Sequence, residues 1–96
     1  MPAVYAIAVH NVTDPEMLQK YAAGAGPTLA EAEIIAVDTS VRTVEGEPRG
    51  RAVILKFADE EAARRWYDSE AYREILPLRL NATSDGWAGL VTAFGD

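Results

Sequence analysis

The chain has 96 residues, of which 15 are acidic and 9 basic, and its formal net charge is −6 at pH 7. This negative charge disfavours binding to nucleic-acid phosphates and to anionic membrane surfaces. Because the sequence contains no cysteine, disulfides, thiol catalysis and thiolate metal ligands are excluded. We expect a single domain over residues 1–96, without a signal peptide or a membrane span, and therefore a cytoplasmic location.

The first predicted elements are a strand from about Ala3 to His10 and a helix that follows it. Residues 13–16, Thr-Asp-Pro-Glu, are typical of a helix start, with Thr13 as the capping residue and Glu16 completing a capping box. Residues 24–27, Gly-Ala-Gly-Pro, then interrupt the helix. Since these glycines follow a helix and not a strand, they do not predict a phosphate-binding loop.

Two further strands are predicted to pair as neighbours. β-Branched residues from Ile34 to about Val44 indicate the second strand. Residues 45–50 form a polar turn, and the third strand, Arg51 to Phe57, then returns antiparallel to the second.

The second helical region is predicted to begin at residues 59–61, where three acidic side chains favour a helix start. Ser69 restarts a helix that Pro77 is expected to bend, and Trp87 to Phe94 forms a fourth strand. The order is therefore β-α-β-β-α-β. Right-handed crossovers would place both helical segments on one face of a four-stranded antiparallel sheet. The predicted fold class is α+β with a ferredoxin-like topology.

Three predicted strand segments, residues 4–9, 52–55 and 87–94, are apolar on both alternating faces. A strand with one face in water should instead alternate apolar and polar residues. If the helices cover only one face, the other is an exposed apolar surface of the kind that mediates association. We therefore predict a homodimer joined through the sheet faces, with no nucleic acid or membrane as a partner.

Arg79 is the first candidate for a functional role, because helical spacing directs it along the same stripe as the apolar Tyr72 and Leu76. A buried guanidinium is costly unless it is paired. One interpretation is a structural ion pair, with Glu45, Asp14 or Glu47 as the partner. The other is a clamp for an anion or carboxylate at a pocket.

His10 is the only histidine of the chain, and it ends the first strand. It is interpreted as a rim residue of the fold or as a group that transfers a proton. A metal site is not expected, because one histidine and no cysteine leave too few ligands. Ser40, Ser69 and Ser84 lie in ordinary strand, cap or loop positions, so a catalytic serine triad is disfavoured, and no cofactor is predicted.

Four aromatic residues lie on the helical faces that should cover the sheet: Tyr21, Trp66, Tyr67 and Tyr72. Core packing explains them, but each also carries a polar group that needs a partner when buried. The small residues Ala6, Ala8 and Gly89 could leave room beside them. A pocket lined by phenols, one arginine and one carboxylate would suit a small aromatic or carboxylated molecule.

The chain resembles the domain-of-unknown-function 1330 family of small dimeric α+β barrel proteins. The resemblance covers nearly the whole chain and rests on the following positions: Tyr5, Asp14, Tyr21, Glu45-Gly46, residues 53–57, residues 62–72 and residues 76–79. It implies a ferredoxin-like protomer, a dimer joined sheet to sheet and no established activity. It also implies that Glu45, Tyr72 and Arg79 line a shared pocket. Residues 30–33, Ala-Glu-Ala-Glu, depart from the family pattern, in which a glycine pair is common.

Three functions compete at this point. The first is a dimer that binds a small molecule between helices and sheet. The second, by analogy with larger proteins of the same architecture, is a cofactor-independent monooxygenase or an isomerase-like enzyme. Arg79 would then hold an anion, Glu45 or His10 would move a proton, and Tyr72 or Tyr67 would donate to an oxyanion. The third is a structural dimer without a ligand.

Overall fold

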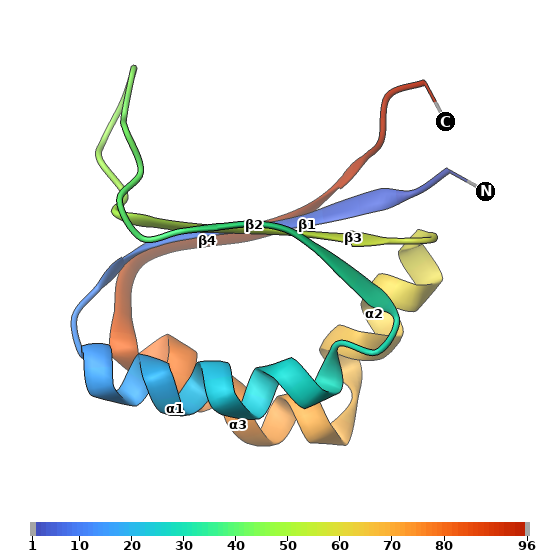
Figure 1. Cartoon of the computed structure of the whole chain (residues 1–96), viewed down its shortest axis with the longest axis horizontal. Helices are drawn as coiled ribbons and strands as arrows, with labels where there is room; N and C mark the ends of the chain where they lie inside the picture. The colour runs from blue at the N-terminus through green and yellow to red at the C-terminus, as the bar shows by residue number, and fades with distance from the viewer. Residues whose placement is uncertain (1, 96) are drawn as a thin grey trace.

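The computed structural model describes residues 2–95, which form a four-stranded antiparallel sheet with its helices on one face (Figure 1). The strands lie in the order β2-β3-β1-β4 and have these bounds: β1 (Val4–Val12), β2 (Ala32–Asp38), β3 (Arg51–Phe57) and β4 (Thr83–Thr92). The helices are α1 (Pro15–Ala25), a short 3₁₀ turn η1 (Gly26–Thr28), α2 (Glu60–Asp68) and α3 (Glu70–Ala82). The predicted ferredoxin-like α+β fold is confirmed.

Helix α1 begins one residue later than the capping box predicts. The Asp14 carboxylate accepts a hydrogen bond from the amide of Met17 at 3.1 Å, so Asp14 and not Thr13 caps the helix. The amides of Thr13 and Asp14 both donate to the carbonyl of Ala82, at 2.8 and 3.1 Å. The predicted Thr13 cap is wrong because these bonds keep the chain beside the end of α3, and the turn into α1 starts only at Asp14.

The caps of α2 and α3 follow the sequence prediction. Asp59 accepts from the amide of Ala62 at 2.8 Å, and Ser69 accepts from the amide of Tyr72 at 3.2 Å. Ser69 also donates through its hydroxyl to the carbonyl of Trp66 at 2.7 Å. One serine therefore ends α2 and begins α3, which fixes the angle between the two helices that carry Trp66 and Tyr72.

The second strand is shorter than predicted, because β2 ends at Asp38 and not near Val44. The Asp38 carboxylate accepts from the amide of Ser40 at 2.7 Å, a local bond that turns the chain out of the strand. Residues 39–50 then form a loop without regular structure. Figure 1 shows this loop on the side of the sheet opposite to the helices.

The fourth strand starts earlier than predicted, at Thr83 instead of Trp87, and it ends at Thr92. It follows α3 directly, and its pairing with β1 is irregular between Val9 and Asn11. Asp85 has a φ of 54° beside this irregularity, a conformation that aspartate tolerates better than most residues. The turn-like residues near Asp85 therefore lie at a bulge within the strand and not in a loop before it.

The core has two parts, which meet at Trp66. Between α1 and α3 the buried residues include Leu18, Tyr21, Tyr72 and Leu76. Between α2 and the sheet they are Val4, Leu55, Phe57, Ala62 and Ala63. Trp66 is half-buried and packs against both groups. Among residues 2–95, no helix is long and apolar enough to cross a membrane.

The sheet face away from the helices is apolar and uncovered within the chain. Ile7 pairs with Ile54 of β3 and Gly89 of β4, and Val9 pairs with Trp87. Residues paired directly across two strands project to the same face of the sheet, and His10 projects toward the helices. Ile7 and Val9 are separated from His10 by an odd number of positions on β1, so they and their partners project away from the helices. Trp87 is 55% exposed on this face. Both faces of the central strands are therefore apolar, as the sequence pattern predicts.

Candidate functional site

A cavity of about 430 Å³ lies between the sheet and the helices. Small side chains of the central strands, Ala6, Ala8 and Ala88, leave the space open on the sheet side. The other lining residues are Ile7, His10, Tyr21, Arg51, Val53, Leu55, Ala63, Arg64, Trp66, Tyr67, Asp68, Tyr72, Arg79, Gly89 and Leu90. The cavity therefore has an apolar and aromatic wall with a few polar groups.

The aromatic wall brings together the four aromatic residues that the sequence analysis selects. The ring centroids of Trp66 and Tyr72 are 4.2 Å apart, and those of Tyr67 and Tyr72 are 5.7 Å apart. The hydroxyls of Tyr21 and Tyr72 share a 2.7 Å hydrogen bond, and Trp66 Nε1 donates to the hydroxyl of Thr28 at 2.9 Å. Each of these polar groups has a partner, so the aromatic wall is a pre-formed surface.

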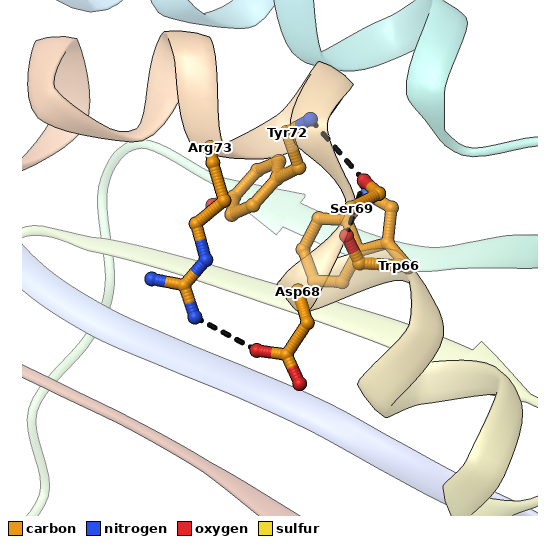
Figure 2. A network of polar contacts seen from close by, with 5 residues as sticks. All are labelled: Trp66, Asp68, Ser69, Tyr72 and Arg73. Atoms are coloured by element: carbon orange, nitrogen blue, oxygen red, sulfur yellow. Dashed lines mark hydrogen bonds and ion pairs between the residues drawn. The ribbon is translucent and has the colours of Figure 1, made fainter.

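The junction between α2 and α3 positions this wall (Figure 2). The bonds of Ser69 hold the residues that carry the two rings, and the picture shows the rings of Trp66 and Tyr72 beside each other. Arg73 forms a 2.7 Å ion pair with Asp68, and its guanidinium carbon lies 4.7 Å from the ring centroid of Tyr67. This exposed pair flanks the cavity, because Asp68 and Tyr67 both line it.

A cluster of two arginines and one histidine, Arg51, Arg79 and His10, also lines the cavity. All three side chains are buried, with exposed fractions of 1%, 8% and 9%. Arg51 Nη1 lies 2.9 Å from His10 Nε2. A guanidinium can only donate, so Nε2 accepts and the neutral ring carries its proton on Nδ1. Within residues 2–95, His10 Nδ1 and Arg79 Nε are buried without a hydrogen-bond partner.

The cluster has no anionic partner among the described residues. The ion pairs of residues 2–95 involve four other arginines, namely Arg42, Arg64, Arg65 and Arg73. Burial, and then the charges of Arg51 and Arg79, lower the pKa of His10 from 6.5 to about 4. Burial and the hydrogen bond with Tyr72 raise the pKa of Tyr21. The histidine and the phenol are therefore both neutral at pH 7, and the two guanidinium groups remain charged.

The structure separates Glu45 from the other predicted site residues. Glu45 lies in the exposed loop 39–50 and does not line the cavity. Neither Glu45, Glu47 nor Asp14 forms an ion pair with Arg79 within residues 2–95. The same residues contain no group of three histidine, aspartate or glutamate side chains that could hold a metal ion.

Arg51 is the residue of this site that the sequence analysis misses. In the sequence, Arg51 is the polar first residue of a strand that follows a polar turn, so nothing local distinguishes it from a surface residue. The signal that identifies it is its register, because Arg51 pairs directly with His10 and therefore shares its face. Only the pairing of β1 with β3 reveals this relationship.

These features define a small α+β protein of ferredoxin-like fold with an aromatic and cationic cavity between helices and sheet. The chain belongs to the family described as domain of unknown function DUF1330, whose model matches residues 3–92. The resemblance found in the sequence is thereby confirmed. A comparison with curated proteins found no match.

Solved structures support the same fold. A protein of unknown function from Rhodopseudomonas palustris has a TM-score of 0.84 at 13% identity, over 99% of this chain and 85% of that one. A dimeric ferredoxin-like protein of unknown function from Thermobifida fusca has a TM-score of 0.65 at 17% identity, over 96% and 92%. SnoaB, a cofactor-independent oxygenase from Streptomyces nogalater, has a TM-score of 0.68 at 19% identity, over 100% and 97%.

Proposed function

We propose that this protein binds a small, partly aromatic molecule in the cavity between its helices and sheet. The observation that carries the proposal is the cavity itself, with a volume of about 430 Å³ and a wall of Trp66, Tyr67 and Tyr72. Sites for small molecules are typically concave, mostly apolar and about 300–1,000 Å³ in volume. Three small residues in the sheet keep this space open, where larger side chains would fill it as core.

Binding of a neutral aromatic probe, 2-naphthamide, tests this proposal. Trp87 is replaced by Phe so that Trp66, which lines the cavity, is the remaining tryptophan. We expect saturable quenching of its fluorescence by the probe. Ala8→Leu fills the cavity from the sheet side and should abolish quenching, whereas Ala71→Leu, at an exposed position of α3, should not. Equal quenching in Ala8→Leu and Ala71→Leu contradicts binding in this cavity.

An enzymatic role is the second candidate, supported by the likeness in fold to a cofactor-independent oxygenase. The phenols of Tyr67 and Tyr72 would be the donors to a developing oxyanion. His10 is a poor base in the observed arrangement, because Nε2 already accepts from Arg51 and Nδ1 carries the proton. Oxygen uptake and product formation with a bound aromatic phenol such as 2-naphthol test this role. A bound but unchanged probe supports binding alone.

Glu45 enters the proposed site only through a second copy, because its loop lies outside the cavity of its own protomer. The substitution Glu45→Gln tests its contribution to probe binding. Weaker binding by this variant, with the fold unchanged, would include Glu45 in the site. Unchanged binding would restrict the site to the residues between helices and sheet.

We further propose a homodimer joined through the outer faces of the sheets. The support is the uncovered apolar sheet face that contains Trp87 and Ile54, together with a neighbour in fold that is itself dimeric. Sedimentation at micromolar concentration should give twice the monomer mass of 10.4 kDa. Ile54→Lys should produce monomers. Leu80→Lys, which replaces a 58% exposed leucine on α3, should leave the dimer intact.

A further inference from the structure

We propose that Arg51 and Arg79 together bind the anionic group, a carboxylate or phosphate, of a ligand whose apolar or aromatic body lies along the rest of the cavity. This inference rests on the proposed function, because it names the chemistry of the molecule that the cavity binds. It adds a residue, Arg51, and a second positive charge to the single-arginine clamp that the sequence suggests.

The first argument is the missing counter-ion. Arg51 and Arg79 are at least nine-tenths buried, and neither forms an ion pair with any carboxylate in residues 2–95. Their charges also repel each other. Burial lowers the pKa of Arg51, and the positive charge of Arg79 lowers it further. Buried charges are normally paired, and an unpaired one costs several kcal/mol. Two unpaired guanidinium groups in one cavity indicate that an anion completes the site.

The second argument is the supply of free donors. Arg79 Nε and His10 Nδ1 are buried without a partner within residues 2–95, although both belong to side chains that line the cavity. The bond from Arg51 to His10 Nε2 places the ring proton on Nδ1, so this nitrogen also offers a donor. Carboxylate and phosphate oxygens are the acceptors that arginine forks recognise best.

The third argument fixes the shape of the ligand. His10 and Ala6 lie on the same face of β1 and both line the cavity. Four residues of extended strand span roughly 13 Å, which is longer than a carboxylate or phosphate alone. Beyond the cluster the wall includes Trp66 and Leu55, and the alanines of the sheet also line it. The cavity therefore suits a charged end at His10 and an apolar body that extends toward Ala6.

The fourth argument concerns the aromatic neighbour of Arg79. The guanidinium carbon of Arg79 lies 6.0 Å from the ring centroid of Tyr21, whose hydroxyl is bonded to Tyr72. Burial and this hydrogen bond raise the pKa of Tyr21, so its phenol supplies no negative charge to Arg79. An anion at this position interacts with two full charges in a poorly solvated site, where charge-assisted hydrogen bonds are strong.

The experiment compares three probes with the same ring system: 2-naphthoate, 2-naphthyl phosphate and the neutral 2-naphthamide. Dissociation constants are measured by calorimetry at constant ionic strength. We expect at least one of the two anions to bind roughly ten- to a hundredfold more tightly than the amide. The anion with the lower dissociation constant identifies carboxylate or phosphate as the preferred group. Inorganic phosphate and benzoate report whether the charged end binds without the large body.

Arg79→Gln and Arg51→Gln should each remove most of the preference for the anion, measured as the ratio of the affinities of the anion and the amide for the same variant. Arg65→Gln is the matched control, because this exposed arginine is paired with Glu31 and does not line the cavity. It should retain the preference. Circular dichroism checks that each variant is folded. If Arg79→Gln does not fold, Arg79→Lys takes its place in the comparison.

Two results would overturn the inference alone, and a third would overturn the proposed function with it. In one, the amide binds the wild-type protein as tightly as both anions, which refutes the anion site but leaves the proposed binding function in place. In the other, the anions are preferred equally by wild type and by both arginine variants. If none of the three naphthyl probes binds the wild-type protein, the anion site and the proposed function both fail. The wild-type comparison decides the matter even where a variant does not fold.

Discussion

Arg51 and His10 are directly paired residues of β3 and β1, and the Arg51 guanidinium donates to His10 Nε2 at 2.9 Å. The pair is buried, and the donor of this hydrogen bond is a permanent cation. A second proton on the ring would place two positive charges in contact. The neutral form of His10 is therefore part of the folded structure, and its tautomer is fixed by its strand neighbour.

This relationship predicts that acid destabilises the protein through His10. The pKa of His10 is 6.5 in the unfolded chain and about 4 in the folded protein, lowered by burial and by Arg51 and Arg79. Between these values the unfolded chain binds more protons, so the free energy of unfolding falls as the pH falls from 6.5 to about 4. We expect a loss of about 3 kcal/mol from this group, measured by urea unfolding across this range.

The variant His10→Gln isolates this contribution. Glutamine still offers an oxygen to Arg51 but does not titrate. The difference in unfolding free energy between wild type and variant should therefore change between pH 7 and pH 4, while the shared carboxylates cancel. Parallel pH profiles for the two proteins would contradict a neutral, buried His10.

Removal of one buried charge should stabilise the unliganded protein. Arg79→Met keeps an unbranched apolar side chain but removes a guanidinium that has no ion-pair partner within residues 2–95. We expect the free energy of unfolding to rise by about 1–2 kcal/mol, since functional sites often reduce stability. Arg65→Met, an exposed and paired position, should show no such gain. Destabilisation by Arg79→Met would mean that a partner of the structure already satisfies the charge.

The fold could be predicted from the sequence because the local signals for helix starts and strands agree with the topology. The acidic start at Asp59 and the serine at position 69 cap α2 and α3 as expected. The errors fall where a local bond overrides the pattern. The Asp38 carboxylate ends β2 although apolar residues continue beyond it. Asp85 adopts a positive φ within β4, so turn-like residues lie inside a strand.

Only part of the site could be predicted from the sequence. Helical spacing is enough to direct Arg79 and Tyr72 toward the sheet, and both line the cavity. Arg51 could not be found in this way, because its position depends on the register of β1 with β3, which composition does not determine. For Glu45 the sequence offered a possible ion pair with Arg79 and a family likeness, but Glu45 lies in the exposed loop 39–50 and does not line the cavity of its own chain.

The hydrogen bond between the hydroxyls of Tyr21 and Tyr72 should couple the two residues. Each is buried, and each is the hydrogen-bond partner of the other at 2.7 Å. Tyr21→Phe or Tyr72→Phe leaves one hydroxyl unpaired and should cost about 1–2 kcal/mol of unfolding free energy. The double variant should cost less than the sum by about 1 kcal/mol, measured as a double-mutant cycle in urea. Additive costs would show that the bond contributes nothing.

Gly24 of α1 should resist substitution although alanine is the better helix former. A Cβ at this position would lie 2.8 Å from Cγ2 of Ile75 on α3, closer than the two helices permit. We expect Gly24→Ala to lower the unfolding free energy by about 1–2 kcal/mol, since overpacking exceeds the gain in helix propensity. Gly26→Ala is the control, because nothing lies within 4 Å of its added Cβ. Ile75→Leu removes the branched methyl and should rescue Gly24→Ala, whereas a Gly24→Ala protein as stable as wild type would mean that α1 and α3 can separate at no cost.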